Sequence, residues 1–151
     1  LMSKEIKEAA ITILHVDYKS FLLQLRDLKH WIPYPGHWGV FGGEIKDHES
    51  PETAGRRELE EELGYVPQTS TYFRDYYIDS NVHLHIFYGD ITVPFTELRL
   101  MEGMDMGLFS LEQIYSLKLY SKKMGKSFPV PPLLKEFFKD FMEHISSSKL
   151  E

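Results

Sequence analysis

The sequence contains no cysteine, which excludes disulfide bonds, thiolate metal ligands and a cysteine nucleophile. This absence agrees with a reducing compartment, so we expect a cytoplasmic protein. The longest apolar runs, at 9–14 and 21–25, are far shorter than the ~20 residues that a membrane-spanning helix needs. The first residues also lack the apolar stretch of a signal peptide. We therefore expect no association with a membrane.

Positive charge is scarce as well, because the formal net charge is −6. Proteins that grip long nucleic acids neutralise the phosphates with a basic patch. One small basic cluster is present, and we interpret it as a solvated loop between helices rather than a nucleic-acid surface: Lys118, Lys122, Lys123 and Lys126. An acidic protein that takes an anionic substrate would need bound cations to hold it.

The length of 151 residues and the hydrophobic fraction of 42% fit one globular domain. We expect this domain to cover residues 2–149, with Leu1 and residues 150–151 left over from cloning. A homodimer is left open by the sequence.

Strands are predicted where apolar residues run or alternate between short polar turns. Four such segments are present: 9–16, 21–25, 72–78 and 82–91. A loop rich in proline and glycine follows the second of them and leads to Gly42 and Gly43.

The clearest helix covers residues 51–63, because Ser50 can cap its free N–H groups and Gly64 suits the left-handed residue that ends a helix. A capping box at 110–113 opens a short helix, and prolines at 131–132 open the last one. An apolar stripe in that last helix predicts core packing: Leu134, Phe137, Phe138, Phe141 and Ile145. Strands around a central helix, followed by further helices, indicate an α/β fold in layers.

Three glutamates of the central helix, Glu58, Glu61 and Glu62, share one face within an arc of ~100°. Hard carboxylate oxygens at short range suit Mg²⁺ or Mn²⁺. A solvated acidic face is the alternative. However, we expect Gly42 and Gly43 to lie in the glycine-rich loop before the helix, where they let the backbone approach a ligand closely. Together these features predict a site for a metal–diphosphate complex.

Eight residues of this region stand at a fixed spacing: Gly43, Glu49, Arg57, Glu58, Leu59, Glu61, Glu62 and Gly64. Position by position, segment 43–65 resembles the Nudix box. Tyr65 stands where that family usually has a small aliphatic residue, and Phe41 stands where many members have proline. The resemblance implies a Nudix-type α/β/α sandwich with a mixed central sheet. It also implies hydrolysis of a phosphoanhydride in a nucleoside diphosphate linked to another group.

The resemblance implies a role for each matching residue. The glutamates Glu58, Glu61 and Glu62 would bind Mg²⁺ or Mn²⁺ together with the carbonyl oxygen of Gly42. Arg57 would orient these glutamates as a further catalytic residue. Glu49 would brace Arg57 or the loop, and Gly64 would end the helix.

The resemblance implies that the general base is either a glutamate of the box or an acid in a later loop. Our candidate in that loop is Glu102, with Glu97 and Asp105 behind it. An ordinary surface acid is an equal alternative for Glu102.

Residues that would contact the rest of the substrate are chosen by their positions near the box. Arg26 ends a strand and could meet the substrate, although a surface ion pair is the alternative. Trp38 and Phe41 could stack on a base, with core packing as their alternative. Further candidates for binding are Gly43, Trp31 and Tyr34.

His83 and His85 stand two residues apart on one strand face, but the sequence shows no further ligand that would complete a zinc site. We therefore interpret them as histidines that line a strand face, near the substrate.

The expected partner is a small-molecule nucleotide. One group of substrates comprises (deoxy)nucleoside triphosphates, oxidised or not, and the other comprises nucleoside diphosphate sugars such as ADP-ribose. We favour the first group because no additional N-terminal domain is evident. Three rivals are weighed against this enzyme. The intact glutamates argue against a non-catalytic nucleotide sensor. The acidic net charge argues against an RNA 5′-end hydrolase. The unmodified box and the lack of cysteine argue against an isomerase.

Overall fold

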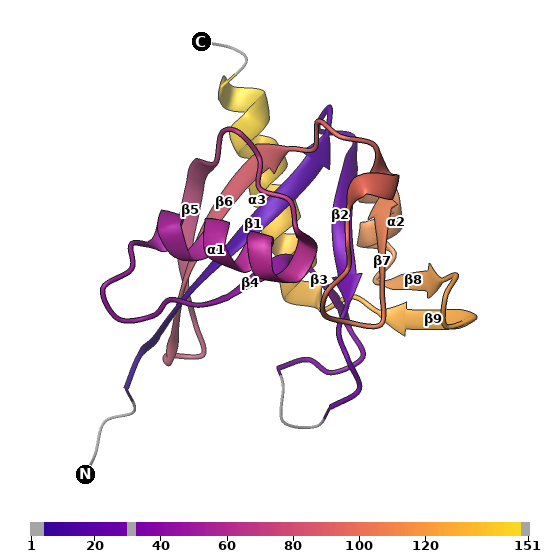
Figure 1. Cartoon of the computed structure of the whole chain (residues 1–151), viewed down its shortest axis with the longest axis horizontal. Coiled ribbons are helices and arrows are strands. Elements are labelled where there is room, and N and C mark those ends of the chain that lie inside the picture. Colours follow the sequence, from indigo (N-terminus) through magenta and orange to yellow (C-terminus); the bar gives the residue numbers. More distant parts are fainter. Residues whose placement is uncertain (1–4, 30–32, 149–151) are drawn as a thin grey trace. The chain divides into compact units, whose positions relative to one another are not determined.

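The computed structural model describes residues 5–29 and 33–148, whose elements are labelled in Figure 1. They divide into two compact units. The described part of the first unit comprises 5–15 and 40–101, and that of the second comprises 16–29, 33–39 and 102–148. No helix of these described residues is long and apolar enough to cross a membrane.

The first unit contains a mixed sheet with the strand order β4–β1–β6–β5. The bounds of its strands are β1 (Lys7–Val16, whose last residue belongs to the second unit), β4 (Phe41–Glu44), β5 (Thr71–Ile78) and β6 (Val82–Asp90). β1 runs parallel to β6 and antiparallel to β4, and β5 runs antiparallel to β6. A short 3₁₀ turn, η1 (Phe95–Glu97), follows β6.

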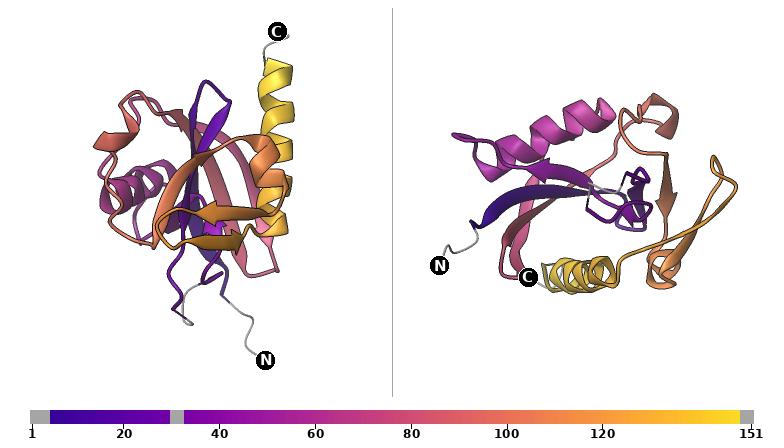
Figure 2. Two further views of the ribbon diagram at one scale, coloured as in Figure 1. Left: turned by 90° about the vertical axis from the view of Figure 1, so that its right-hand side faces the viewer. Right: turned by 90° about the horizontal axis from the view of Figure 1, so that it is seen from below.

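The helix α1 (Pro51–Leu63) has the bounds that the sequence predicts. The Ser50 hydroxyl accepts a hydrogen bond from the Thr53 N–H at 3.1 Å, and Gly64 ends the helix with a φ of 65°. Ala54 of α1 packs in a buried cluster with Ala10 of β1 and Phe87 of β6. Alanine at the contact lets the helix lie close to the sheet face that these residues share (Figure 2).

The second unit is built around β2 (Ser20–Leu25), which pairs antiparallel with β3 (Trp38–Gly39) and with β7 (Asp105–Phe109). The remaining elements are α2 (Leu111–Tyr115), the hairpin of β8 (Lys118–Ser121) and β9 (Lys126–Pro129), and α3 (Pro132–Ser148). The apolar stripe of α3 is buried as predicted. In this core the Phe21 ring meets the rings of Phe138 and Phe141 edge-on, at centroid distances of 5.0 and 6.4 Å.

Two expectations from the sequence are wrong. The segment with Gly42 and Gly43 is not a loop but strand β4, in which these residues pair with Ile11 and Ala10 of β1. The expectation for the lysine cluster is wrong in part, since Lys118 and Lys126 lie in strands β8 and β9, while Lys122 and Lys123 do lie in the exposed turn between them. These strands are too short to show the alternation by which a strand is recognised. The capping box on α2 and the four predicted strands are confirmed to within two residues.

Candidate active site

Arg57 lies at the centre of a charged cluster on α1. Its Nε and Nη2 atoms donate to the two carboxylate oxygens of Glu49 at 2.6 and 2.9 Å. Its Nη1 donates to Glu58 at 3.0 Å and to Glu61 at 3.2 Å, while Nη2 also reaches the carbonyl oxygen of Glu44 at 3.1 Å. The guanidinium therefore fixes the loop before α1 and two glutamates of the helix at once.

The bond to Arg57 determines the ionisation of Glu49. Hydrogen bonding from Arg57, followed by that from the Lys46 N–H, lowers the pKa of Glu49 from 4.5 to about 2. The Glu49 partner in turn raises the pKa of Arg57. The pair is thus fully charged at any physiological pH.

Glu62 is the most deeply buried of the three glutamates, with 5% of its surface exposed. Its Oε2 accepts a hydrogen bond from the N–H of Gly42 at 3.0 Å. A buried carboxylate is costly unless hydrogen bonds or cations compensate it, so its retention here indicates a specific partner. This contact joins α1 directly to β4.

Gly42 and Gly43 leave room that a side chain would fill. A Cβ atom on Gly43 would lie 2.6 Å from Oε1 of Glu58, and one on Gly42 would overlap the carbonyl oxygen of Ala10. Gly42 also has a φ of 154°, which L residues rarely adopt. The glycines therefore let the backbone of β4 pass directly beside the carboxylates of Glu58 and Glu62.

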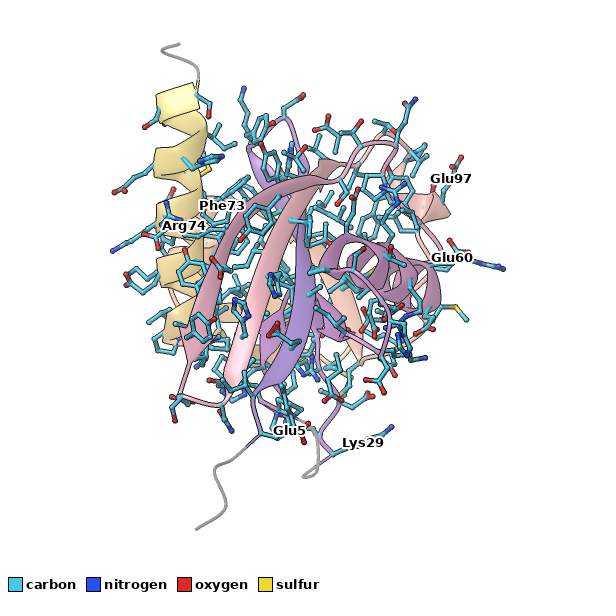
Figure 3. All side chains as sticks on the ribbon, turned by 90° about the vertical axis from the view of Figure 1, so that its left-hand side faces the viewer. Glu5, Lys29, Glu60, Phe73, Arg74 and Glu97 are labelled. Atoms are coloured by element: carbon cyan, nitrogen blue, oxygen red, sulfur yellow. The ribbon has the colours of Figure 1, made fainter. Side chains whose placement is uncertain are left out.

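The donor set suits a divalent cation. One guanidinium (+1) stands among four carboxylates (−4), which gives the cluster a formal charge of −3: Arg57, Glu49, Glu58, Glu61 and Glu62. Hard oxygen donors in a cluster of net negative formal charge match the preference of Mg²⁺ and Mn²⁺. Glu60, by contrast, is exposed and lies on the outer side of α1 (Figure 3).

Tyr65, one of the two departures from the box, has a structural explanation. Its hydroxyl donates to the carbonyl oxygen of Asp90 at 2.8 Å and accepts from the N–H of Thr92 at 3.0 Å. The tyrosine thereby ties the end of α1 to the end of β6, a connection that an aliphatic side chain could not make.

The candidates for the general base lie in different surroundings. Glu102 is exposed at the start of a segment of the second unit, and Glu97 is exposed in η1 of the first unit. Asp105 has structural partners, because its Oδ2 accepts from the Ser121 hydroxyl at 2.6 Å and its Oδ1 from the Met106 N–H at 2.8 Å. These contacts make Asp105 the weakest of the three candidates.

Burial favours the packing alternative for two of the aromatic residues. Trp38 is 1% exposed, donates its indole N–H to the carbonyl oxygen of Leu119 at 3.1 Å, and meets Phe109 edge-on. Phe41 is fully buried in β4. A base could stack on either ring only if the core opened.

Arg26 and Tyr34 lie at the surface of the second unit. The Nε of Arg26 donates to the carbonyl oxygen of Pro33 at 2.8 Å, which fixes the side chain along its own loop. Tyr34 is half exposed and meets the ring of His37. Trp31 lies outside the described residues.

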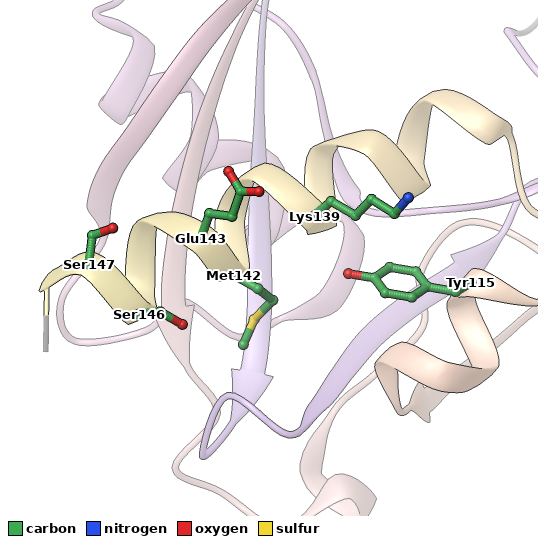
Figure 4. A pocket seen from close by; sticks show the side chains of 6 residues that line it. All are labelled: Tyr115, Lys139, Met142, Glu143, Ser146 and Ser147. Atoms are coloured by element: carbon green, nitrogen blue, oxygen red, sulfur yellow. The ribbon is translucent and has the colours of Figure 1, made fainter.

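A shallow depression on the second unit contains none of the predicted site residues. Figure 4 shows Tyr115 reaching from α2 toward α3 and the other lining residues standing on α3: Lys139, Met142, Glu143, Ser146 and Ser147. It has neither a carboxylate cluster nor a glycine strand, so it does not compete with the α1 cluster as a phosphate site.

One grouping in the first unit was missed by the sequence argument. Glu8 of β1 lies against His83 and His85 of β6. The three side chains meet because Glu8 stands opposite His83 in the parallel pairing of β1 with β6. The sequence holds no local signal for that register, because about seventy-five positions separate the residues.

Comparison with known proteins places the chain in a family. The NUDIX domain model matches residues 6–129. No curated protein matches the sequence. The structure resembles a MutT protein from Methanosarcina mazei Go1, with a TM-score of 0.72 and 21% identity over 95% of this chain and 97% of that one.

Two further structures share the fold. A MutT NUDIX hydrolase from Burkholderia pseudomallei has a TM-score of 0.69 and 20% identity, over 91% of this chain and 98% of that one. The NUDIX domain of Shewanella oneidensis NrtR, complexed with ADP ribose, has a TM-score of 0.67 and 16% identity, over 96% and 90%. The predicted α/β class with a mixed sheet is confirmed. Because the NUDIX domain model matches residues 6–129 and the structure has the fold of these relatives, the chain belongs to the Nudix family and is a Nudix hydrolase.

Proposed function

We propose that the protein hydrolyses a phosphoanhydride bond of a small nucleotide with Mg²⁺ or Mn²⁺, and that the substrate is a (deoxy)nucleoside triphosphate or its oxidised form. The observation that carries the proposal is the placement of Glu62, which is buried and bonded to the N–H of Gly42 at 3.0 Å. This contact sets a carboxylate beside the glycine strand, where a diphosphate could approach the backbone. The cytoplasmic location expected from the missing cysteine belongs to the same proposal.

Glu58, Glu61, Glu62 and the carbonyl oxygen of Gly42 would hold the cation. When bound, such a cation offsets the charge of the diphosphate and lowers the pKa of the attacking water. Arg57 positions Glu58 and Glu61 through its Nη1 bonds, at 3.0 and 3.2 Å. Glu49 keeps the guanidinium in that orientation, because two parallel hydrogen bonds fix its plane.

The general base is assigned to Glu102 or to a glutamate of the box. Glu102 is exposed, so a Glu102→Gln variant would keep its fold. A drop in kcat without a change in KM would support the role of base. An unchanged rate would make Glu102 an ordinary surface residue and leave the base to the box.

A nucleoside diphosphate sugar is the second candidate substrate. The structure of the related NUDIX domain in complex with ADP ribose supports it, since that fold accommodates such a ligand. The structural neighbours named MutT support the nucleoside triphosphate proposal, again through the shared fold. The α1 cluster serves both, because it would hold the diphosphate that both classes share.

A turnover screen tests the proposal. The protein is incubated with nucleoside triphosphates, oxidised nucleotides, dinucleoside polyphosphates and diphosphosugars, each with Mg²⁺, with Mn²⁺ and with EDTA. We expect turnover of the triphosphate group and its loss with EDTA. Preferred turnover of ADP-ribose would select the second candidate. Tight nucleotide binding without any turnover would favour the non-catalytic sensor.

The metal assignment has its own variant and control. Glu62→Gln should lower kcat by about 10–100-fold or more, because it removes one charged ligand. Glu60→Gln is the matched control, since Glu60 is on the same helix but exposed on its outer side. A Glu62→Gln protein with the wild-type rate and metal dependence would contradict the assignment.

A further inference from the structure

Three side chains of the first unit converge on the sheet face that α1 covers in part. Glu8 lies on β1, and His83 and His85 lie on β6, the strand beside it. One ligand atom from each lies within 4.8 Å of the others. None of the three belongs to the box, so they form a group separate from the glutamates of α1.

The backbone explains why the three side chains meet. Glu8 stands opposite His83 in the parallel register, and His85 follows two positions along β6, on the same face. Two adjacent strands thus present one carboxylate and two imidazoles from fixed positions. β1, β6 and β5 lie side by side in Figures 1 and 3.

The distances assign the atoms that face the centre of the group. Nδ1 of His83 lies 2.8 Å from Oε2 of Glu8, and Nε2 of His85 lies 3.4 Å from Oε1 of the same carboxylate. The two imidazole rings are 4.2 Å apart between centroids. Two ring nitrogens and a carboxylate oxygen are therefore available to one ion.

Asp75 of β5 contacts the side of His83 that faces away from Glu8. Its Oδ2 lies 2.6 Å from Nε2 of His83, and Tyr77 stacks on the same ring at a centroid distance of 4.2 Å. An ionised carboxylate can only accept a hydrogen bond, so Nε2 of His83 is the donor to Asp75. A metal-binding histidine characteristically donates its other N–H to a carboxylate in this way, which fixes the tautomer and the ring plane.

We propose that Glu8, His83 and His85 form a second metal site, for a transition-metal ion such as Zn²⁺, with Asp75 holding His83 in the binding orientation. Two imidazoles and one carboxylate suit Zn²⁺ better than Mg²⁺, which prefers an all-oxygen shell. Three protein ligands leave a fourth tetrahedral position for water or another small ligand.

The competing arrangement is an ion-pair network without metal. The hydrogen bonds of His83 to Asp75 and to Glu8 raise its pKa, which favours a doubly protonated ring that bridges the two carboxylates when no metal is bound. A metal ion would take the place of the proton on Nδ1. The two arrangements differ in metal binding, which is what the experiment measures.

The protein is stripped with EDTA and dialysed against Zn²⁺ in the presence of excess Mg²⁺, which is added to fill the proposed metal site at the α1 glutamates. We expect one bound Zn²⁺ per chain and, with Co²⁺ as the probe, visible absorption. Glu8→Gln and His85→Ala should each weaken Zn²⁺ binding at least tenfold, and Asp75→Asn by about 10–100-fold. Glu8 is exposed, so its variant should fold even if His85→Ala does not.

Two controls locate the ion. His48→Ala removes an exposed histidine outside the group and should leave Zn²⁺ binding unchanged. Glu62→Gln should also leave it unchanged. The proposal is overturned if no Zn²⁺ stays bound in the presence of excess Mg²⁺. It is also overturned if the Glu8→Gln and His85→Ala variants both bind Zn²⁺ as the wild type does, or if Glu62→Gln abolishes Zn²⁺ binding. The result does not depend on which nucleotide is hydrolysed.

Discussion

The carboxylate of Glu49 accepts two hydrogen bonds from the guanidinium of Arg57, at 2.6 Å from Nε and 2.9 Å from Nη2. This parallel pair uses one edge of the guanidinium and leaves Nη1 directed at Glu58 and Glu61. Glu49 lies before α1 in the chain, so the contact fixes this loop on the helix, while the bond from Nη2 to the carbonyl oxygen of Glu44 ties the helix to β4. The geometry makes Arg57 a positioning residue for the glutamates rather than a group that needs to touch substrate.

Replacing Arg57 by lysine should impair metal use while keeping the positive charge. A lysine has one ammonium group and cannot bond to Glu49 with two donors while also reaching Glu58. We expect kcat to fall by about 10–100-fold and the Mg²⁺ concentration for half-maximal rate to rise. Steady-state kinetics over a Mg²⁺ series measures both.

Arg56→Lys is the matched control for this change, since Arg56 is the neighbouring arginine on α1. It should have near wild-type kinetics. An equal effect of the two substitutions would show that the hydrogen bonds between Glu49 and Arg57 are not what positions the glutamates for metal use.

The low pKa of Glu49 predicts a pH-dependent contribution to stability. Its pKa is about 2 in the folded protein, against an ordinary value of 4.5. Because the folded-state pKa is the lower one, the stabilisation is complete above pH 4.5 and is lost as the pH falls toward 2. The difference in urea midpoint between the wild type and Glu49→Gln should therefore be constant at neutral pH and shrink below pH 4.5.

Glu60→Gln serves as the control in the same titration, because it removes an exposed carboxylate from the same helix. Its difference from the wild type should change less over this range. A Glu49→Gln difference that grows on acidification would have the wrong sign for this explanation.

Local signals explain why α1 was predictable. Ser50, Pro51 and Gly64 stand next to the helix in the sequence, and each acts on its nearest turn. The face shared by Glu58, Glu61 and Glu62 follows from helical spacing alone. The bond between Arg57 and the carbonyl oxygen of Glu44 could not be predicted from helical spacing, because it depends on the path of the intervening loop.

Strand pairing over long separations explains most of what the sequence did not show. β7 contains Met106 and Gly107 beside each other, and only its pairing with β2 makes it a strand. The placement of Glu8 beside His83 depends likewise on the β1–β6 register. Such a register is decided by the packing of whole sheet faces, which no short motif records.

Gly42→Ala should destabilise the protein. The residue has a φ of 154°, and a Cβ there would overlap the carbonyl oxygen of Ala10 in the neighbouring strand. We expect a loss of about 1–3 kcal/mol in the free energy of unfolding. Gly39→Ala is the control, because nothing lies within 4 Å of its Cβ position. Urea unfolding of both variants measures the difference, and equal midpoints would contradict the strain at Gly42.

Trp38→Phe separates core packing from base stacking. It removes the indole N–H that bonds to Leu119 in the interior, so we expect a loss of about 1–3 kcal/mol in stability. KM should stay within roughly twofold of the wild type, because a buried ring does not meet substrate. Tyr34→Phe, at an exposed ring, should leave stability unchanged. A raised KM for Trp38→Phe without loss of stability would restore the stacking role.

Gly43→Ala should affect metal use more than folding. A Cβ at this position would lie 2.6 Å from Oε1 of Glu58, which is the end of a flexible side chain, so the carboxylate can move away at little cost to the fold. That movement would displace Glu58 from the oxygen donors of Glu62 and Gly42. We expect the unfolding midpoint to stay close to that of Gly39→Ala, while the Mg²⁺ concentration for half-maximal rate rises roughly tenfold. A Gly43→Ala protein with unaltered Mg²⁺ dependence would mean that the position of Glu58 beside β4 is not needed for metal binding, and would shift that role to Glu61 and Glu62.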